Sequence, residues 1–208
     1  RASRMPPDGV PQGGMHELRH VYAELAEVSK DYHEARQHAN LDKLTGLYNR
    51  RFFDERLNRL LLEQHAFCLA MIDLDGFKLV NDNYGHQTGD VVLKRVAKLG
   101  NQLLEDHGWV CRYGGEELVV LLANPDIHFC QMLLEQYRIG VASLDWREPG
   151  LGITFSGGLV ASVPGLDAKG LLDIVDAEVY RAKRDGKNRI YLGGVAPLAQ
   201  HEVPPADD

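Results

Sequence analysis

The sequence predicts an α/β protein of the α+β type, in which a mixed central sheet carries flanking helices. An apolar run at residues 67–72 indicates a buried strand, since it is short and is followed directly by turn residues. Residues 109–122 indicate a hairpin, with β-prone runs on both sides of Gly114 and Gly115. Segments with apolar residues at helical spacing separate these strands. The order of the elements implies one mixed sheet with its helices largely on one face.

A long helix is predicted first, over residues 15–40, which contain neither proline nor glycine. Its apolar positions recur in steps of three and four, as in a heptad seam. These positions are Leu18, Val21, Leu25, Val28, Tyr32, Ala35 and Ala39. Because this stripe is narrower than a globular helix needs, we expect a coiled coil for dimerisation and signalling. A single amphipathic helix packed on its own domain is the alternative.

The remaining elements follow a turn-rich joint at residues 42–49. Helices are predicted at residues 50–64, 78–84, 90–106, 127–144 and 166–185, and strands at 67–72, 110–113, 118–123, 153–163 and 189–192. Gly114 and Gly115 should adopt positive φ in a two-residue turn. Gly157 and Gly158 indicate a place where two backbone segments come close.

Both ends of the chain lack these patterns. Residues 1–14 are rich in proline and glycine, so we expect a flexible linker or a vector-derived remnant. Residues 193–208 contain three prolines and end in acids, so we expect a disordered tail.

The composition narrows the class of function. A net charge of −7 argues against a nucleic-acid partner, since such proteins usually present a basic face. The three cysteines form no CxxC pair, so we expect neither a disulfide framework nor a structural zinc site. No apolar stretch has the length of a membrane span, and the first residues lack the apolar core of a signal peptide. We therefore expect a cytoplasmic protein.

Carboxylates gather beside two of the predicted strands. Asp73 follows the strand at residues 67–72, and Glu116 and Glu117 follow the turn of the hairpin. If these strands are neighbours, the three side chains approach one end of the sheet. Such acids need a positive partner, and hard oxygen ligands suit Mg²⁺ or Mn²⁺ together with the phosphates of a nucleotide.

Motifs along most of the chain carry a family resemblance. They lie at residues 42–51, 72–78, 81–82, 85–90, 112–118, 156–158, 180–183 and 186–188. In their order and spacing they resemble the GGDEF domains, the diguanylate cyclases, in a variant that reads Gly-Gly-Glu-Glu-Leu. Leu118 stands where the family usually has phenylalanine, which should alter packing more than chemistry. The resemblance implies a palm-like nucleotidyl cyclase fold for a GGDEF domain at residues 41–192.

The resemblance also implies roles for the acids. Asp73, Glu116 and Glu117 would be catalytic, and they would bind the metal together with the main-chain carbonyl of Leu74. Glu117 would bind a second metal ion or help to remove the proton of a ribose 3′-hydroxyl.

The triphosphate of GTP would lie at the start of a helix, on Gly76, Phe77 and Lys78, where main-chain N–H groups are unpaired. By the same resemblance Lys183 and Lys187 would bind the phosphates. The simpler alternative is that these two lysines complement the dipole at the end of a helix.

The guanine base would be read by two further residues. The resemblance assigns this role to Asn81 and Asp90, and such a site should reject ATP, because adenine would leave a buried carboxylate unpaired. Helix capping and turn formation are the alternative roles of these side chains.

Other motif residues are expected to be structural. Arg112 and Tyr113 should belong to the scaffold, and the joint at residues 42–50 should couple the first helix to the domain. Many relatives carry an inhibitory Arg-x-x-Asp site, but Glu105 and Gly108 occupy its two positions here. Without the planar fork of an arginine, we expect no product inhibition at that place.

The resemblance therefore implies a diguanylate cyclase that condenses two GTP molecules into cyclic di-GMP and releases pyrophosphate. It would act as a homodimer with one GTP per subunit, joined through the coiled coil and regulated by an upstream sensor outside this chain. We expect no nucleic-acid partner and no direct membrane span. Two alternatives remain: a catalytically idle module that binds GTP or cyclic di-GMP, and a dimerisation adaptor whose pocket is idle.

Overall fold

The computed structural model describes residues 39–194 and, before them, His20, Tyr22, Glu24, Leu25 and Glu27. The chain divides into two units, residues 1–40 and residues 41–208. The heptad prediction for residues 15–40 lies mostly outside the described residues, as do the predictions for residues 1–14 and for nearly all of the tail. Among the residues described, no helix combines the length and the apolar character that crossing a bilayer requires.

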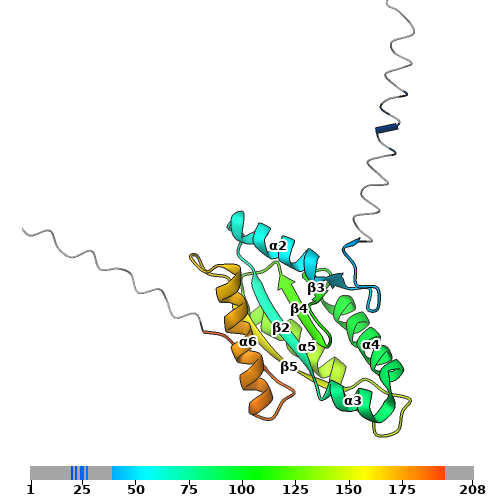
Figure 1. The fold of residues 1–208 in the computed structure, drawn as a ribbon. Helices are drawn as coiled ribbons and strands as arrows, with labels where there is room; N and C mark the ends of the chain where they lie inside the picture. The colour runs from blue at the N-terminus through cyan, green and yellow to red at the C-terminus, as the bar shows by residue number, and fades with distance from the viewer. Residues whose placement is uncertain (1–19, 21, 23, 26, 28–38, 195–208) are drawn as a thin grey trace, which may run out of the picture. The chain divides into compact units, whose positions relative to one another are not determined.

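A six-stranded mixed sheet forms the centre of the second unit, in the order β1-β3-β4-β2-β5-β6 (Figure 1). The strands are β1 (Tyr48–Asn49), β2 (Cys68–Asp75), β3 (Gly108–Arg112), β4 (Glu117–Leu122), β5 (Thr154–Ala161) and β6 (Ile190–Leu192). β2 runs antiparallel to both of its neighbours, β4 and β5, whereas the two outer strands pair in parallel. The central position of β2 places the end of this strand between two other strands.

Within residues 41–194 of this unit, five helices connect the strands: α2 (Arg50–Leu62), α3 (Phe77–Tyr84), α4 (His86–Leu104), α5 (Ile127–Ala142) and α6 (Ala168–Arg184). Polar side chains begin three of them. Asn49, Asp126 and Asp167 each accept hydrogen bonds from main-chain N–H groups in the first turn of α2, α5 and α6. The helices and strands predicted between residues 50 and 192 all exist, and their ends differ by a few residues from the predicted ones.

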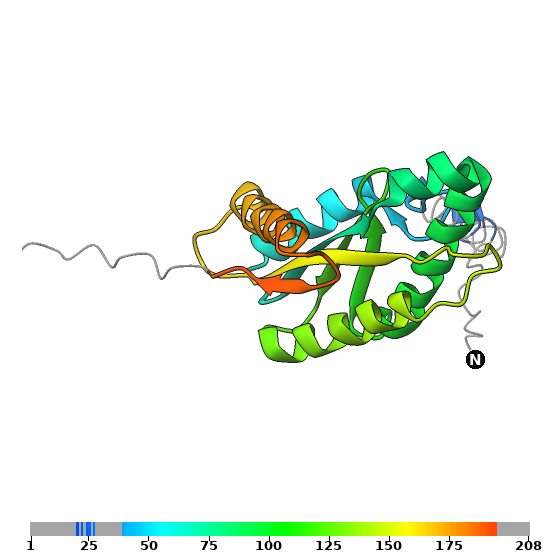
Figure 2. The same cartoon turned by 90° about the horizontal axis from the view of Figure 1, so that it is seen from below.

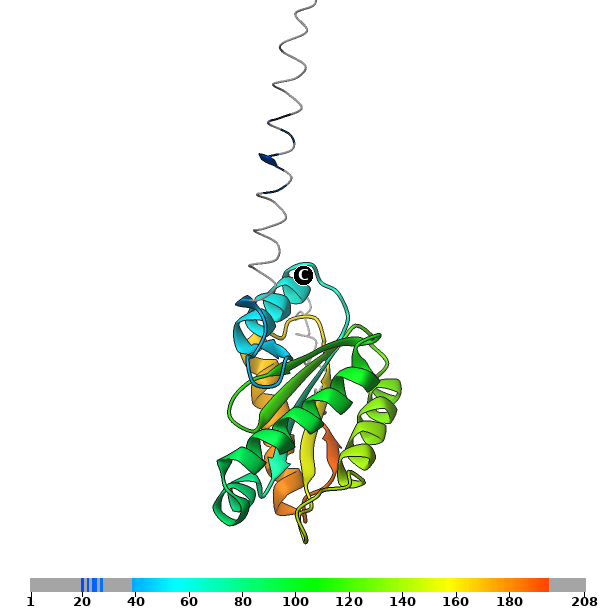
Figure 3. The same cartoon turned by 90° about the vertical axis from the view of Figure 1, so that its right-hand side faces the viewer.

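Helices cover both faces of the sheet, so the prediction that they lie largely on one face is wrong. Cys68, Ala70 and Ile72 of β2 belong to the apolar cluster under α3, α4 and α5, whereas Leu69 and Met71 belong to the cluster under α2 and α6. Figures 2 and 3 show α5 and α6 on opposite sides of the strands. The unbroken apolar run of β2 is typical of a strand that is buried on both sides.

The hairpin connection also differs from its prediction. Neither Gly114 nor Gly115 has a positive φ. The main-chain N–H groups of Tyr113 and Gly114 both donate to the carbonyl of Glu117, over 2.9 and 3.3 Å, and the last residues paired in the ladder are Arg112 and Leu118. The connection is therefore longer than the two-residue turn that demands left-handed residues, and the predicted turn is wrong.

The close approach predicted at residues 157–158 is confirmed for Gly158. A Cβ built on this glycine would overlap the carbonyl oxygen of Val175 in α6. A hydrogen atom at this position therefore lets α6 pack directly on β5. This contact matters for the site, because the end of α6 carries Lys183.

Candidate functional site

The predicted catalytic acids meet where β2 and β4 lie side by side. Asp73 is paired with Glu117 across the antiparallel ladder, and with Ser156 of β5 on its other side. The N–H of Leu74 donates to the carbonyl of Glu116 over 3.4 Å. The structure thus brings Asp73, Glu116 and Glu117 together, as the sequence predicted from neighbouring strands.

A lysine from α6 reaches the first of these acids. Lys183 Nζ lies 2.6 Å from Asp73 Oδ2, and the Asp73 side chain is only 13% exposed. Lys183 belongs to the last turn of α6, whose packing on β5 depends on Gly158. In this structure, then, Lys183 provides the positive charge beside Asp73.

Two of the acids, Asp73 and Glu117, have a raised pKa. Burial raises the pKa of Asp73, and the charges of Glu116 and Asp75 add to this, while Lys183 acts in the opposite direction. Burial also raises the pKa of Glu117, followed by the charges of Asp73 and Glu116. Mutually repelling carboxylates gain from a cation placed among them.

The donor set of this cluster fits a divalent cation. Carboxylate and carbonyl oxygens are the ligands that Mg²⁺ and Mn²⁺ prefer. Within the part of the chain that the structure describes, no three His, Cys, Asp or Glu side chains are already arranged as a complete metal cluster. The acids are therefore brought close by strand pairing, and Asp73 has Lys183 as its partner.

The residues predicted to hold phosphate lie next to these acids in the fold. Gly76 ends the turn after β2 with φ 71° and precedes the first residue of α3, and no side chain caps that helix. Phe77 is buried, whereas Lys78 is exposed. The N–H groups at the start of α3 are thus unoccupied by a capping side chain, as an anion site requires.

The two residues predicted to read guanine come from α3 and α4, which pack against each other. A Cβ built on Gly89 would overlap Asn81 Oδ1, so the Asn81 side chain lies directly on the backbone of Gly89. Asp90 is the next residue and is exposed. The structure therefore brings Asn81 and the start of α4 together, close enough for one ligand to contact both helices.

Lys187 lies in the turn between α6 and β6, and its side chain is exposed. Its main-chain N–H donates to the carbonyl of Ala182 over 2.9 Å, and its φ is 63°. The alternative role of Lys183 was to complement the dipole at the end of α6. In the structure the ammonium group of Lys183 pairs with Asp73 instead.

A comparison with protein families identifies the family to which this chain belongs. Residues 39–189 match the model of the family described as diguanylate cyclase, GGDEF domain. The chain belongs to the GGDEF family.

Named relatives agree with this assignment. The chain is 34% identical to the diguanylate cyclase VdcA of Vibrio cholerae over 84% of this chain and 51% of that protein. It is 35% identical to the diguanylate cyclase DgcP of Pseudomonas aeruginosa over 80% of this chain and 26% of that protein. The chain thus spans about half of the first relative and about a quarter of the second.

Solved structures show the same fold. The coiled coil and GGDEF domain of DgcB from Caulobacter crescentus, in complex with cyclic di-GMP, matches with a TM-score of 0.76 and 30% identity over 87% of this chain and 100% of that chain. The active GGEEF domain of a diguanylate cyclase from Vibrio cholerae matches with a TM-score of 0.67 and 32% identity over 72% of this chain and 99% of that chain. The mixed sheet with flanking helices is therefore the GGDEF cyclase fold.

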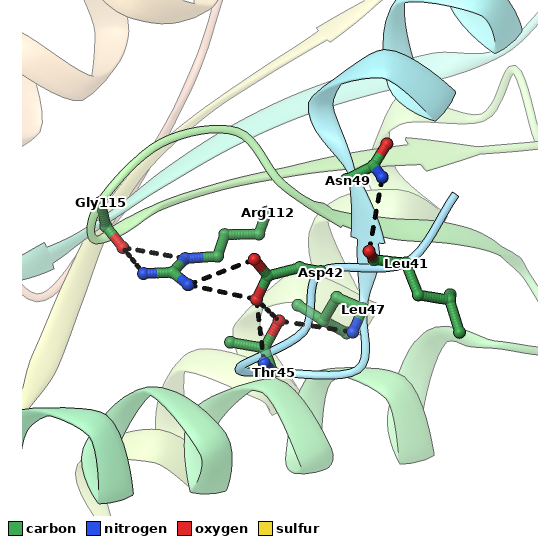
Figure 4. A network of polar contacts seen from close by, with 7 residues as sticks. All are labelled: Leu41, Asp42, Thr45, Leu47, Asn49, Arg112 and Gly115. Carbon is green, nitrogen blue, oxygen red and sulfur yellow. Dashed lines mark hydrogen bonds and ion pairs between the residues drawn. The ribbon is translucent and has the colours of Figure 1, made fainter. Parts of the chain in front are cut away.

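Arg112 links the loop at residues 113–116, between β3 and β4, to the joint at residues 42–49 (Figure 4). Its guanidinium donates to the carbonyl of Gly115 over 2.9 and 3.1 Å and to both carboxylate oxygens of Asp42 over 3.1 and 3.3 Å. Thr45 donates to the same carboxylate through its N–H and its hydroxyl. Burial would raise the pKa of Asp42, but the hydrogen bonds from Thr45 and Arg112 outweigh it and lower that pKa. Arg112 thus acts as scaffold, as predicted.

The place of the family's inhibitory motif holds no arginine. Glu105 follows α4 and accepts a hydrogen bond from the side chain of Asn101 over 2.8 Å. Gly108 opens β3, and a Cβ built on it would overlap the carbonyl oxygen of Leu121. Both residues line a depression of about 290 Å³.

Sequence reasoning gave no role to Asp75 or Asp176. Asp75 accepts hydrogen bonds from Thr154, Ser156 and Asn188. Its spacing of two from Asp73 placed it on the same face of β2, and this alternation could have revealed it. Asp176 of α6 raises the pKa of Glu117 by its charge, a long-range relation that no local pattern shows.

Proposed function

We propose that this chain is a diguanylate cyclase domain that condenses two GTP molecules into cyclic di-GMP and releases two pyrophosphates. The observation that carries the proposal is the pairing of Asp73 with Glu117 across β2 and β4, with Lys183 at 2.6 Å from Asp73. Membership of the GGDEF family supports it, as does the similarity to the diguanylate cyclases VdcA and DgcP.

Each acid has a defined part in this reaction. Asp73, Glu116 and Glu117, with the carbonyl of Leu74, hold a divalent cation, Mg²⁺ or Mn²⁺. When bound, such an ion neutralises phosphate charge and acidifies the attacking hydroxyl. Glu117 is also suited to accept the proton of the ribose 3′-hydroxyl, because its raised pKa brings it nearer to neutral pH.

The nucleotide is oriented by groups around the acids. The N–H groups of Phe77 and Lys78 face the phosphates, and Lys183 and Lys187 add positive charge. Asn81 and Asp90 bind the guanine edge. A carboxylate in that position accepts from the N1–H and amino groups of guanine, which adenine cannot offer in the same pattern, so ATP is a poor substrate.

Two copies of the domain are needed, because one subunit holds one GTP and each 3′-hydroxyl attacks the α-phosphorus of the other. A coiled coil at residues 15–40 would raise the local concentration of the two half-sites and set their orientation. An upstream sensor would act by changing the geometry of these helices. The dimer, the sensor and a cytoplasmic location stay predictions.

The direct test is incubation of the protein with GTP and Mg²⁺, followed by chromatography for cyclic di-GMP. Glu116→Gln should abolish product formation while thermal unfolding stays that of the wild type. Glu63→Gln, an exposed acid beyond the end of α2, is the matched control and should keep full activity.

The outcomes separate the alternatives. GTP binding without product, even after fusion of a dimeric leucine zipper to the N-terminus, would indicate an idle nucleotide-binding module. No GTP binding in magnesium buffer would contradict the proposed site altogether.

A further inference from the structure

The turn between α6 and β6 has an unusual backbone. Gly186, Lys187 and Asn188 are consecutive residues with positive φ, at 113°, 63° and 48°. Residues other than glycine rarely adopt this region, because Cβ then approaches the neighbouring carbonyl. Two such residues in succession persist only where the surrounding structure fixes them, and such strain often accompanies a functional site.

Asp75 provides one of the contacts that fix this turn. Its Oδ2 accepts a hydrogen bond from the main-chain N–H of Asn188 over 3.0 Å and a second from Thr154 Oγ1 over 2.7 Å. Its Oδ1 accepts from the hydroxyl of Ser156, a fully buried residue, over 2.7 Å. The two hydroxyls of β5 therefore hold the carboxylate in the orientation that binds the turn.

Three further hydrogen bonds hold the same turn. Arg138 Nη1 of α5 donates to Asn188 Oδ1 over 2.7 Å. Arg189 Nε donates to the carbonyl of Lys187 over 2.9 Å, and the N–H of Lys187 donates to Ala182 over 2.9 Å. Both peptide groups of Lys187 are thus fixed, while its side chain is exposed.

Lys183 and the turn that carries Lys187 are each bound to one of two aspartates of β2. Lys183 pairs with Asp73, and the turn that carries Lys187 is bound to Asp75, two residues further along the strand. Asp73 and Asp75 lie on the same face of β2, roughly 7 Å apart along the strand. The ammonium group of Lys183 and the backbone that carries Lys187 are therefore held by residues two apart on one strand, a spacing that suits a polyphosphate chain better than a single phosphate.

We propose that Asp75 is a positioning residue, which holds the turn at residues 186–188 so that Lys187 is directed at the polyphosphate of the bound nucleotide. The inference rests on the proposed function and deepens it, because it assigns a residue that governs substrate affinity without touching the substrate. A fixed turn loses little conformational entropy when the ligand binds, so its lysine contributes more to affinity than a mobile one.

A double-mutant cycle with Lys187 tests this role. Asp75→Asn keeps the shape of the side chain but removes the charge and presents an amide to the donors around it. We expect it to raise the KM for GTP about tenfold with little change in kcat, and we expect the same of Lys187→Ala. In the Lys187→Ala background, Asp75→Asn should add less than about twofold, because the positioned group is already absent.

A second variant covers the case in which Asp75→Asn fails to fold. Asn188→Gly relieves the left-handed conformation and keeps the N–H that Asp75 binds, so the fold should persist. We expect the same rise in KM, because the turn becomes adaptable and the contact from Arg138 is lost. Asp173→Asn, an exposed residue of α6 paired with Lys169, is the matched control and should leave KM unchanged.

The binding of inorganic tripolyphosphate, measured by calorimetry with Mg²⁺ present, gives a readout besides activity. Wild type should bind it several-fold more tightly than Asp75→Asn or Asn188→Gly. Additive effects in the cycle, or an unchanged KM and tripolyphosphate affinity in a folded Asn188→Gly variant, would overturn the proposal. An inactive wild type that still binds GTP would contradict the cyclase function instead. The tripolyphosphate affinities of wild type and variants would still decide the role of Asp75.

Discussion

Lys183 Nζ lies 2.6 Å from Asp73 Oδ2, so a lysine of α6 neutralises the acid at the centre of the candidate site. In the proposed reaction both groups have other partners, since Asp73 binds a cation and Lys183 binds phosphate. The ion pair therefore keeps each group in place before the substrate arrives. It also limits the repulsion among Asp73, Glu116 and Glu117, which burial and proximity would otherwise make costly.

This repulsion leads to a prediction about stability and pH. The pKa of Glu117 is raised above its ordinary value of 4.5, so the stability gained by protonating it is fully present below that value and is lost as pH rises through the folded-state pKa. Glu117→Gln should therefore raise Tm at neutral pH by roughly 1–4 °C, the equivalent of up to about 1 kcal/mol. The gain should disappear near pH 4, and cyclase activity should fall at every pH.

Thermal unfolding of both proteins across this pH range is the measurement. Glu63→Gln, at an exposed acid beyond the end of α2, should show no such pH-dependent gain. A lower Tm for Glu117→Gln at neutral pH would show that the carboxylate is stabilising and would contradict the prediction.

The Arg112 network predicts that lysine cannot replace this arginine. Arg112 uses its fork to bind Asp42 and the carbonyl of Gly115 at the same time, a geometry that one ammonium group cannot reproduce. We expect Arg112→Lys to lower the free energy of unfolding by about 2 kcal/mol, measured by urea denaturation. Arg59→Lys, at an exposed pair with Glu63, should show no measurable change. Equal stability of the two variants would mean that the network contributes little.

Two glycines allow packing and ligand binding to be separated. A Cβ on Gly158 would overlap Val175, so Gly158→Ala should destabilise the fold by about 1–3 kcal/mol. A Cβ on Gly115 has no atom within 4 Å, so Gly115→Ala should leave Tm unchanged. If the proposed nucleotide approaches this loop, the same variant should lose about tenfold or more in cyclase activity. Full activity of Gly115→Ala would show that the nucleotide does not approach this loop closely.

The segment before β3 predicts no inhibition by the product. Glu105 and Gly108 offer no arginine fork, so cyclic di-GMP should leave the initial rate unchanged in a titration with GTP as substrate. Submicromolar inhibition at this surface would contradict the prediction. Introducing the family motif should not simply restore inhibition, because any side chain at position 108 would overlap the carbonyl of Leu121. Glu105→Arg with Gly108→Asp should therefore unfold at a lower temperature than Glu105→Arg alone.

Much of the site followed from the sequence, because its motifs lie at the ends of strands whose neighbours could be inferred. Asp73 and Glu117 proved to be paired residues of adjacent strands, as expected. The faces of the sheet could not be inferred in the same way. In β2 every residue from Cys68 to Ile72 is apolar and buried, so periodicity does not reveal which helix covers which side.

Other features depend on contacts between residues that are distant in the sequence. The backbone of Lys187 and Asn188 is held by Asp75 and Arg138, which are distant in sequence, so no local propensity predicts their positive φ. Conversely, Gly114 and Gly115 looked like the residues of a two-residue turn, but they belong to a longer connection. Arg112, which also binds the distant Asp42, holds the carbonyl of Gly115. Local rules failed at the places where distant contacts set the conformation.

The lengths of the outermost strands affect how copies of this domain can meet. β1 and β6, which border the sheet, comprise only two and three residues, whereas the four strands between them are longer. Short borders expose few main-chain groups that a foreign strand could bind, which discourages aggregation by sheet extension. A domain proposed to turn over substrate in pairs can therefore be brought to high local concentration with little risk that its sheets join edge to edge.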